Sequence, residues 1–140
     1  MVTNLTKALL LLGVMAVLTT TAYAGPPAEA SEEARIVAAT SKLKEQPGAM
    51  CLYVKGLCCP SCAIGIRKKV SKLAFVDQEQ FSKGVDLDAK TQLVLIGLKK
   101  GATPDSSKLA KAIEDAGYEP VHLYRLTDGE LKTTPLIAKK

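Results

Sequence analysis

The stretch that decides the fold runs from Cys51 to Cys62 and reads CLYVKGLCCPSC. In its first five residues every second one is aliphatic, which predicts a strand with Leu52 and Val54 on a buried face. The thiol of Cys51 is then expected on the opposite face, and Gly56 allows the turn at the end of the strand. The rest of the stretch therefore leaves a strand and enters a helix.

Two cysteines lie at this entry into the helix. Cys59 and Cys62 stand three residues apart, and in a first helical turn this spacing brings both sulfurs to one side of the helix N-terminus. Pro60 is expected at the first helical position, where the N–H that proline lacks would have no partner anyway. The helix dipole and the free amides of that turn favour negative charge, so they are expected to lower the thiol pKa values. The pair can share a metal ion or form a disulfide.

The rest of the chain supplies the other elements of the fold. Hydrophobic patterns predict, in order, a helix over 63–74, a hairpin over 85–98, a helix over 104–116 and a final strand over 121–126. Thr103 is the expected N-cap of the second helix, and Pro120 suits the start of an edge strand, where a missing N–H costs little. The order β-α-β-β-α-β predicts an α+β fold, the ferredoxin-like βαββαβ sandwich, with a four-stranded antiparallel sheet and two helices on one face. The other face is expected to stay open to solvent.

The motif residues also point to a known family. The chain resembles the heavy-metal-associated domain through Gly56-Leu57, Cys59 and Cys62 at the first turn and Ala116-Gly117-Tyr118 before the last strand. That family includes copper chaperones, the N-terminal modules of copper-transporting ATPases and periplasmic mercury-binding proteins. The resemblance covers residues 50–126 and implies that Cys59 and Cys62 bind a heavy-metal ion, Cu(I) or Hg(II). It also implies that Tyr118 shields the site, although the residue pattern fits a core aromatic equally well.

The remaining two thiols carry separate expectations. Cys58 stands where the family usually has a small residue, and it is either a third ligand or an apolar filler, because neighbouring residues in an extended turn tend to point apart. Cys51 is expected about 20 Å from the pair, at ~3.3 Å per strand residue, which is too far to share an ion in a monomer. It is expected to be a lone thiol or part of an intermolecular disulfide.

The termini suggest export and divide the chain into four parts. Lys7, an apolar run over 8–18 and the sequence Ala22-Tyr23-Ala24 predict a signal peptide over 1–24 that is cleaved after Ala24. The run is shorter than the ~20 apolar residues that span a bilayer, so no stable membrane anchor is expected after cleavage. Residues 25–49 form a polar extension, for which a solvated spacer is favoured over a helix across 28–45. The metal-binding domain follows over 50–126, and 127–140 is expected to be a polar, disordered tail.

Charge and composition limit the kinds of partner and ion that the protein is expected to bind. The 19 basic and 14 acidic residues leave a formal charge of +5, and the lysines are spread over predicted helix faces and turns, so no nucleic-acid partner is expected. Thiolates prefer soft ions such as Cu(I) or Hg(II), and two sulfurs suit a nearly linear ion that an incoming thiolate can take over. We therefore expect a metal-binding protein, not an enzyme, that passes its ion to a membrane metal transporter or another carrier protein. By resemblance to the soluble exported members of the family, its compartment is expected to be the periplasm.

A thiol–disulfide oxidoreductase is the alternative. A Cys-x-x-Cys pair at a helix N-terminus is also the reactive part of thioredoxin-like enzymes, in which a low-pKa thiolate attacks a substrate disulfide. Those enzymes use a larger βαβ framework, usually with a Trp just before the pair, and this chain contains no Trp. A structural zinc site fits less well, because three of the four Cys lie within five residues and the single His122 lies on a distant strand.

Overall fold

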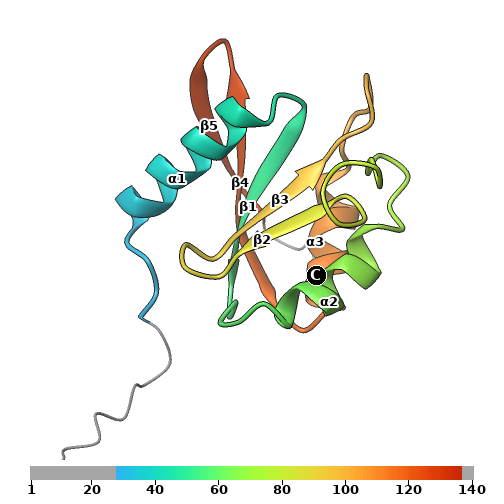
Figure 1. The fold of residues 1–140 in the computed structure, drawn as a ribbon, viewed down its shortest axis with the longest axis horizontal. Coiled ribbons are helices and arrows are strands. Elements are labelled where there is room, and N and C mark those ends of the chain that lie inside the picture. The colour runs from blue at the N-terminus through green and yellow to red at the C-terminus, as the bar shows by residue number, and fades with distance from the viewer. Residues whose placement is uncertain (1–27, 137–140) are drawn as a thin grey trace, which may run out of the picture.

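The computed structural model describes residues 28–136 of the chain (Figure 1). In chain order its elements are α1 (Glu32–Glu45), β1 (Ala49–Lys55), α2 (Cys62–Val70), β2 (Val85–Asp88), β3 (Leu93–Gly97), α3 (Ser106–Glu114), β4 (Glu119–Thr127) and β5 (Glu130–Pro135). The predicted signal peptide over 1–24 and its cleavage after Ala24 lie outside the described residues. Among the helices from 28 to 136, none is long and apolar enough to cross a membrane.

The strands form one antiparallel sheet in the order β2-β3-β1-β4-β5. Strand β1 therefore lies at the centre, between β3 and β4. Figure 1 shows α2 and α3 on one side of the sheet and α1 on the other. From β1 to β4 the order of elements is βαββαβ, so the predicted ferredoxin-like α+β fold is confirmed, with five strands in the sheet instead of four.

The central strand separates two hydrophobic clusters. Leu52 and Val54 are fully buried and pack with apolar residues of α2 and α3, as the alternation predicts. Cys51 and Tyr53 belong to the cluster on the opposite face, and they are also buried, at 0% and 6% exposed. Successive residues of a strand face opposite sides of a sheet, so both faces of β1 are covered. The prediction that one face stays open to solvent is wrong.

Helix α1 covers this second face. Ser31 caps the helix by accepting a hydrogen bond from Ala34 N at 3.2 Å. Of the helix residues, Ala39 and Leu43 are buried, and they pack with Tyr53 and apolar residues of β3 and β4. The prediction of a solvated spacer in this part of the chain is therefore wrong. Two buried apolar residues are enough to hold the helix on the sheet, because the sheet supplies the other apolar side chains of the cluster and this packing stabilises the helix.

A second correction concerns the segment after β4. Asp128 and Gly129, with φ values of 53° and 83°, form a two-residue turn that leads into β5, and such left-handed pairs are typical of tight hairpins. Strand β5 pairs with β4 along its whole length, so the disordered tail predicted from residue 127 onward is wrong for 130–135. Pairing between β4 and β5 begins at His122, so Pro120 lies on the part of β4 that pairs with β1 alone, and the edge position predicted for it agrees with the structure. Pro120 faces Val54 at a register shift between β1 and β4, where the regular ladder is interrupted.

Helix α3 begins later than the sequence suggests. Its N-cap is Asp105, whose side chain accepts hydrogen bonds from Ser107 N at 3.0 Å and Lys108 N at 3.1 Å. A carboxylate at this position satisfies two of the free amides of the first turn. The N-cap predicted at Thr103 is therefore wrong, and Pro104 precedes the helix.

An ion pair ties α1 to the β2 end of the sheet, and we expect it to make docking of α1 sensitive to acid. Lys42 Nζ lies 3.2 Å from Asp88 Oδ2. Burial raises the pKa of Asp88, but hydrogen bonding, foremost to Lys42, and the charge of Lys42 together outweigh it and hold this pKa below its ordinary value of 3.8. At pH values above the unfolded-state pKa of Asp88, the lowered pKa stabilises the folded state. This stabilisation is lost as the pH falls through the folded-state pKa.

Asp88→Asn should therefore lower the free energy of unfolding by up to about 1 kcal/mol at neutral pH. The difference from the unmodified protein should vanish at a pH low enough to protonate Asp88 in both the folded and the unfolded state. Urea unfolding followed by circular dichroism at a series of acid pH values measures this difference. Asp115→Asn is the control, because its partner Lys111 lies 3.0 Å away on the exposed surface of α3. Equal effects of the two variants at neutral pH would show that the Lys42–Asp88 pair does not hold α1 in place.

Candidate metal centre

The site begins where β1 ends. Gly56 has a φ of 89°, a left-handed conformation that residues with a side chain rarely adopt, and it turns the chain out of the strand. Leu57 is 2% exposed and anchors the following loop in the core. Between this anchor and α2 lie Cys58, which is exposed, and Cys59, which is half-buried. A short loop fixed in the core on one side and continuous with a helix on the other therefore carries two of the thiols.

A tight turn links the loop to α2. Cys62 N donates to Cys59 O and Ala63 N donates to Pro60 O, both at 3.1 Å. Such bonds across three residues are those of a 3₁₀ turn. Helix α2 itself begins at Cys62, so the prediction that Pro60 occupies the first helical position is wrong. The turn performs the role expected of the first helical turn, because it brings Cys59 and Cys62 to the same side.

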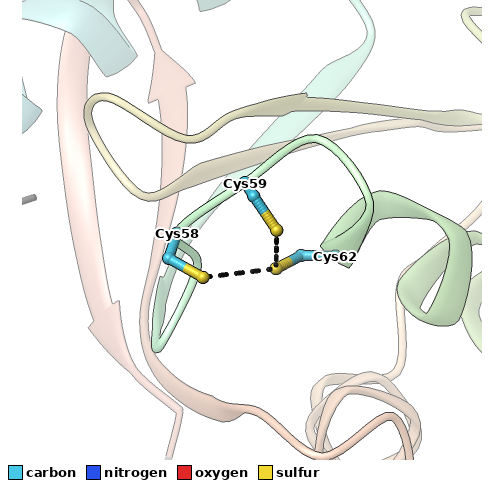
Figure 2. A group of neighbouring side chains, drawn as sticks. All are labelled: Cys58, Cys59 and Cys62. Carbon is cyan, nitrogen blue, oxygen red and sulfur yellow. Dashed lines mark hydrogen bonds between the residues drawn. The ribbon is translucent and has the colours of Figure 1, made fainter. Parts of the chain in front are cut away.

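Three sulfur atoms converge at this turn (Figure 2). The Sγ of Cys59 lies 3.4 Å from the Sγ of Cys62, and the Sγ of Cys58 lies 4.0 Å from it. All three sulfurs lie within 4.8 Å of one another. In the described part of the chain, this is the one group of three or more Cys, His, Asp or Glu side chains placed so closely. A single ion can contact all three sulfurs.

The thiols differ in acidity because their surroundings differ. Burial raises the pKa of Cys62, but hydrogen bonding to the side chain of Tyr118 and to the backbone of Cys58 outweighs it and lowers the pKa to about 6. Hydrogen bonding to Cys59 and then to Cys62 raises the pKa of Cys58. The lowered pKa favours the thiolate form of Cys62, and the raised pKa favours the thiol form of Cys58. A thiolate is the form that binds metal ions.

Two further residues contact the thiols. Ser61 Oγ lies 2.9 Å from Cys59 Sγ. The sequence did not single out this serine, although its position between the two cysteines indicates that it lies at the site. Tyr118 is half-buried against the main core, and hydrogen bonding to Cys62 raises its pKa to about 12. Its ring also lies close to Gly56, where an added Cβ would stand 3.7 Å from Cδ1 of the ring. The tyrosine is thus both a core aromatic and a neighbour of the thiols, and its shielding of a bound ion stays a prediction.

Cys51 and His122 lie apart from this cluster. Cys51 is fully buried beneath α1, and this burial raises the pKa of its thiol to about 12. His122 lies between Tyr53 and Tyr124, with ring centroids 6.2 Å and 6.1 Å away. The separation of Cys51 from the thiol pair agrees with the sequence analysis, and neither residue adds a ligand to the site.

The arrangement defines a class of protein: an α+β sandwich with soft, partly ionised ligands at its first strand-to-helix turn is a thiolate metal-binding domain. Residues 52–119 match the model of a family described as the heavy-metal-associated domain. This part of the chain is therefore a heavy-metal-associated domain, the family that the sequence motif suggested, and it binds heavy-metal ions. Searches of curated proteins and of solved structures found no match to the chain.

Proposed function

We propose that this protein is an exported carrier of a soft metal ion, Cu(I) or Hg(II), and not an enzyme. Cys59 and Cys62 capture the ion in the periplasm, and the protein passes it to a membrane metal transporter or another carrier protein. The observation that carries the proposal is the 3.4 Å separation of these two sulfurs at an exposed turn of a heavy-metal-associated domain.

The donor set supports a soft ion as cargo. Thiolate sulfur favours Cu(I) and similarly soft ions over hard ions such as Mg²⁺ or Ca²⁺, which prefer oxygen ligands. The described residues contribute no carboxylate or imidazole to the cluster. Two thiolates give a linear ion all the ligands it needs, and the lowered pKa of Cys62 supplies one of them at neutral pH.

The graded exposure of the cluster supports transfer by thiolate exchange. Cys62 is 7% exposed, Cys59 is half-buried and Cys58 is exposed, so a partner thiolate can approach from the loop side. As it approaches, one metal–sulfur bond forms to the partner, and one bond to this protein then breaks and leaves a thiolate. The ion passes between two thiolate sites without release to water.

The surface beside the site supports a protein as the receiver of the ion. Ile64, two residues after Cys62 on α2, is 69% exposed. It lines a shallow hollow together with the cations of Arg67, Lys68, Lys72 and Lys83. An exposed apolar side chain among positive charges suits an acidic partner surface with a small apolar contact.

A thiol–disulfide oxidoreductase is the second candidate, because 3.4 Å between Cys59 and Cys62 allows a disulfide after a small shift. In that class of enzyme the reactive, low-pKa thiolate must be accessible to the substrate disulfide. Here the thiol with the lowered pKa is Cys62, which is nearly buried, while the exposed Cys58 has a raised pKa. This distribution favours metal transfer over disulfide exchange.

Transfer kinetics test the proposal. The chain from Gly25 onward, loaded with one equivalent of Cu(I), is mixed with increasing concentrations of a dithiol peptide acceptor, and loss of copper is followed by stopped-flow absorbance. Thiolate exchange requires the rate to rise in proportion to the acceptor concentration. A rate independent of the acceptor would mean that the ion dissociates into solvent first, and would contradict the proposed transfer step.

A further inference from the structure

We propose that Cys58 completes a three-thiolate site, and that this site binds a trivalent thiophilic ion of the arsenite class. The inference rests on the proposed function in using the same Cys59 and Cys62, and it adds a third ligand and a second class of cargo. Three observations support it: the size of the sulfur triangle, the direction of the Cys58 side chain and the exposure of one side of the cluster.

The sulfur spacings fit three ligands better than two. With metal–sulfur bonds of about 2.3 Å, the length of a zinc–thiolate bond, two sulfurs on opposite sides of an ion lie about 4.6 Å apart. Three sulfurs around a planar ion with the same bonds lie about 4.0 Å apart, and closer if the ion sits above their plane. The spacings to Cys62 are 4.0 Å from Cys58 and 3.4 Å from Cys59. A linear ion between Cys59 and Cys62 therefore requires rotation of these side chains to move the two sulfurs apart, whereas a pyramidal ion fits the spacings as they stand.

Cys58 points toward the other thiols. Neighbouring residues in an extended turn were expected to point apart, but Figure 2 shows the sulfurs of Cys58 and Cys59 directed toward the sulfur of Cys62. Positive φ at Gly56 and burial of Leu57 fix the chain just before Cys58 and so orient its side chain over the turn. The third ligand is therefore in place without rearrangement of the fold.

The chemistry of a trivalent ion uses all three sulfurs. Arsenite, As(OH)₃, reacts with three thiols to form three As–S bonds, and each hydroxyl leaves as water with one thiol proton. No electron is transferred, so no oxidant or reductant is required. The product is a pyramid with the arsenic lone pair opposite the sulfurs, and the exposed side of the cluster at Cys58 leaves room for it. With two thiols alone, one hydroxyl stays on arsenic and one bond is lost.

Arsenite binding to the chain from Gly25 onward tests the inference by native mass spectrometry. The unmodified protein should gain one arsenic atom and lose three protons. Cys58→Ser should bind arsenite at least ~100-fold more weakly, because loss of a direct ligand should cost at least as much as loss of an outer-shell partner. Cys51→Ala is the matched control, since it removes a thiol on the other face of the sheet and should leave arsenite binding unchanged.

Cu(I) binding, measured on the same samples, separates this inference from the proposed function. Cys58→Ser should still bind one Cu(I), because Cys59 and Cys62 remain. Equal arsenite affinity of Cys58→Ser and the unmodified protein, or no arsenite binding by either, would overturn the three-thiolate site. If those samples still bound one Cu(I) per chain, the two-thiolate carrier would stand.

Discussion

In a chain that also carries Cys58→Ser, replacing Cys62 by Ser should lower the affinity for Cu(I) by more than ~100-fold, and Cys59→Ser should do the same. The Cys58→Ser change is required because the sulfur of Cys58 lies within 4.8 Å of the other two and would replace the lost ligand. Mutation of a residue that only holds a metal ligand in place lowers metal affinity by roughly 10–100-fold. Removal of one of two direct ligands should therefore lower the affinity further. Cys62→Ser also removes the thiol whose lowered pKa, about 6, favours a thiolate at neutral pH. Competition with a chromogenic Cu(I) chelator measures both affinities.

The two variants also need a test of folding, because Cys62 is 7% exposed and belongs to the main core. Cys59 is half-buried, so Cys59→Ser should unfold in urea at nearly the same concentration as the unmodified protein. The assignment of the metal site would be wrong if folded Cys59→Ser and Cys62→Ser, each combined with Cys58→Ser, both bound one Cu(I) with unchanged affinity.

Leu43→Ala should lower the free energy of unfolding by about 2–5 kcal/mol, the usual cost of removing a buried leucine side chain. Leu43 is 3% exposed and packs against the α1 face of the sheet with Cys51, Tyr53 and Tyr124. Its loss leaves a cavity between the helix and the sheet. Urea unfolding measured by circular dichroism gives the change.

Val37→Ala is the control for this second variant, because Val37 lies on the same helix and is 69% exposed. Its effect should stay within about 0.5 kcal/mol. Labelling of Cys51 by a thiol reagent gives an independent readout, since burial under α1 raises the pKa of this thiol to about 12 and blocks access to it. Leu43→Ala should label faster than Val37→Ala, and equal stability and equal labelling would show that α1 does not pack on the sheet.

Much of the fold could be predicted from local sequence because its signals are local. The alternation of Leu52 and Val54 identifies a strand, and the apolar spacing between Ala63 and Val70 identifies the helix that packs on it. The short connections between these elements then restrict the topology to a small set. The pairing of Cys59 with Cys62 follows for the same reason, because both lie in one turn.

The covering of the second face of the sheet could not be predicted, because the residues that form this cluster come from several separate segments of the chain. Tyrosine is found both inside and outside proteins, so Tyr53 did not show that the face is buried. Cysteine is among the residue types most often buried, so Cys51 was the one local signal for a covered face. The cover comes from α1, which offers Ala39 and Leu43 as buried residues in a largely polar helix. Neither half of the interface has a strong hydrophobic signal by itself.

Strand β5 was missed for a different reason. Its residues are mostly exposed and polar, and backbone pairing to β4 places them, which leaves almost no hydrophobic pattern. The available signal was the dipeptide Asp128-Gly129, a common two-residue hairpin turn. In the site, the direction of Cys58 was likewise undetermined by sequence, because it depends on the backbone angles set at Gly56.

The thiolate metal site is tested most directly by the native mass of the protein isolated under mild conditions from the compartment in which it resides. Such a mass reports bound metal and disulfide bonds together. The proposed function predicts a mass raised by one Cu(I) or Hg(II) ion, and no such ion in the double variant that carries Cys59→Ser and Cys62→Ser. A metal-free mass two protons light, from a Cys59–Cys62 disulfide, with no soft-metal binding after reduction, would contradict it and favour the oxidoreductase.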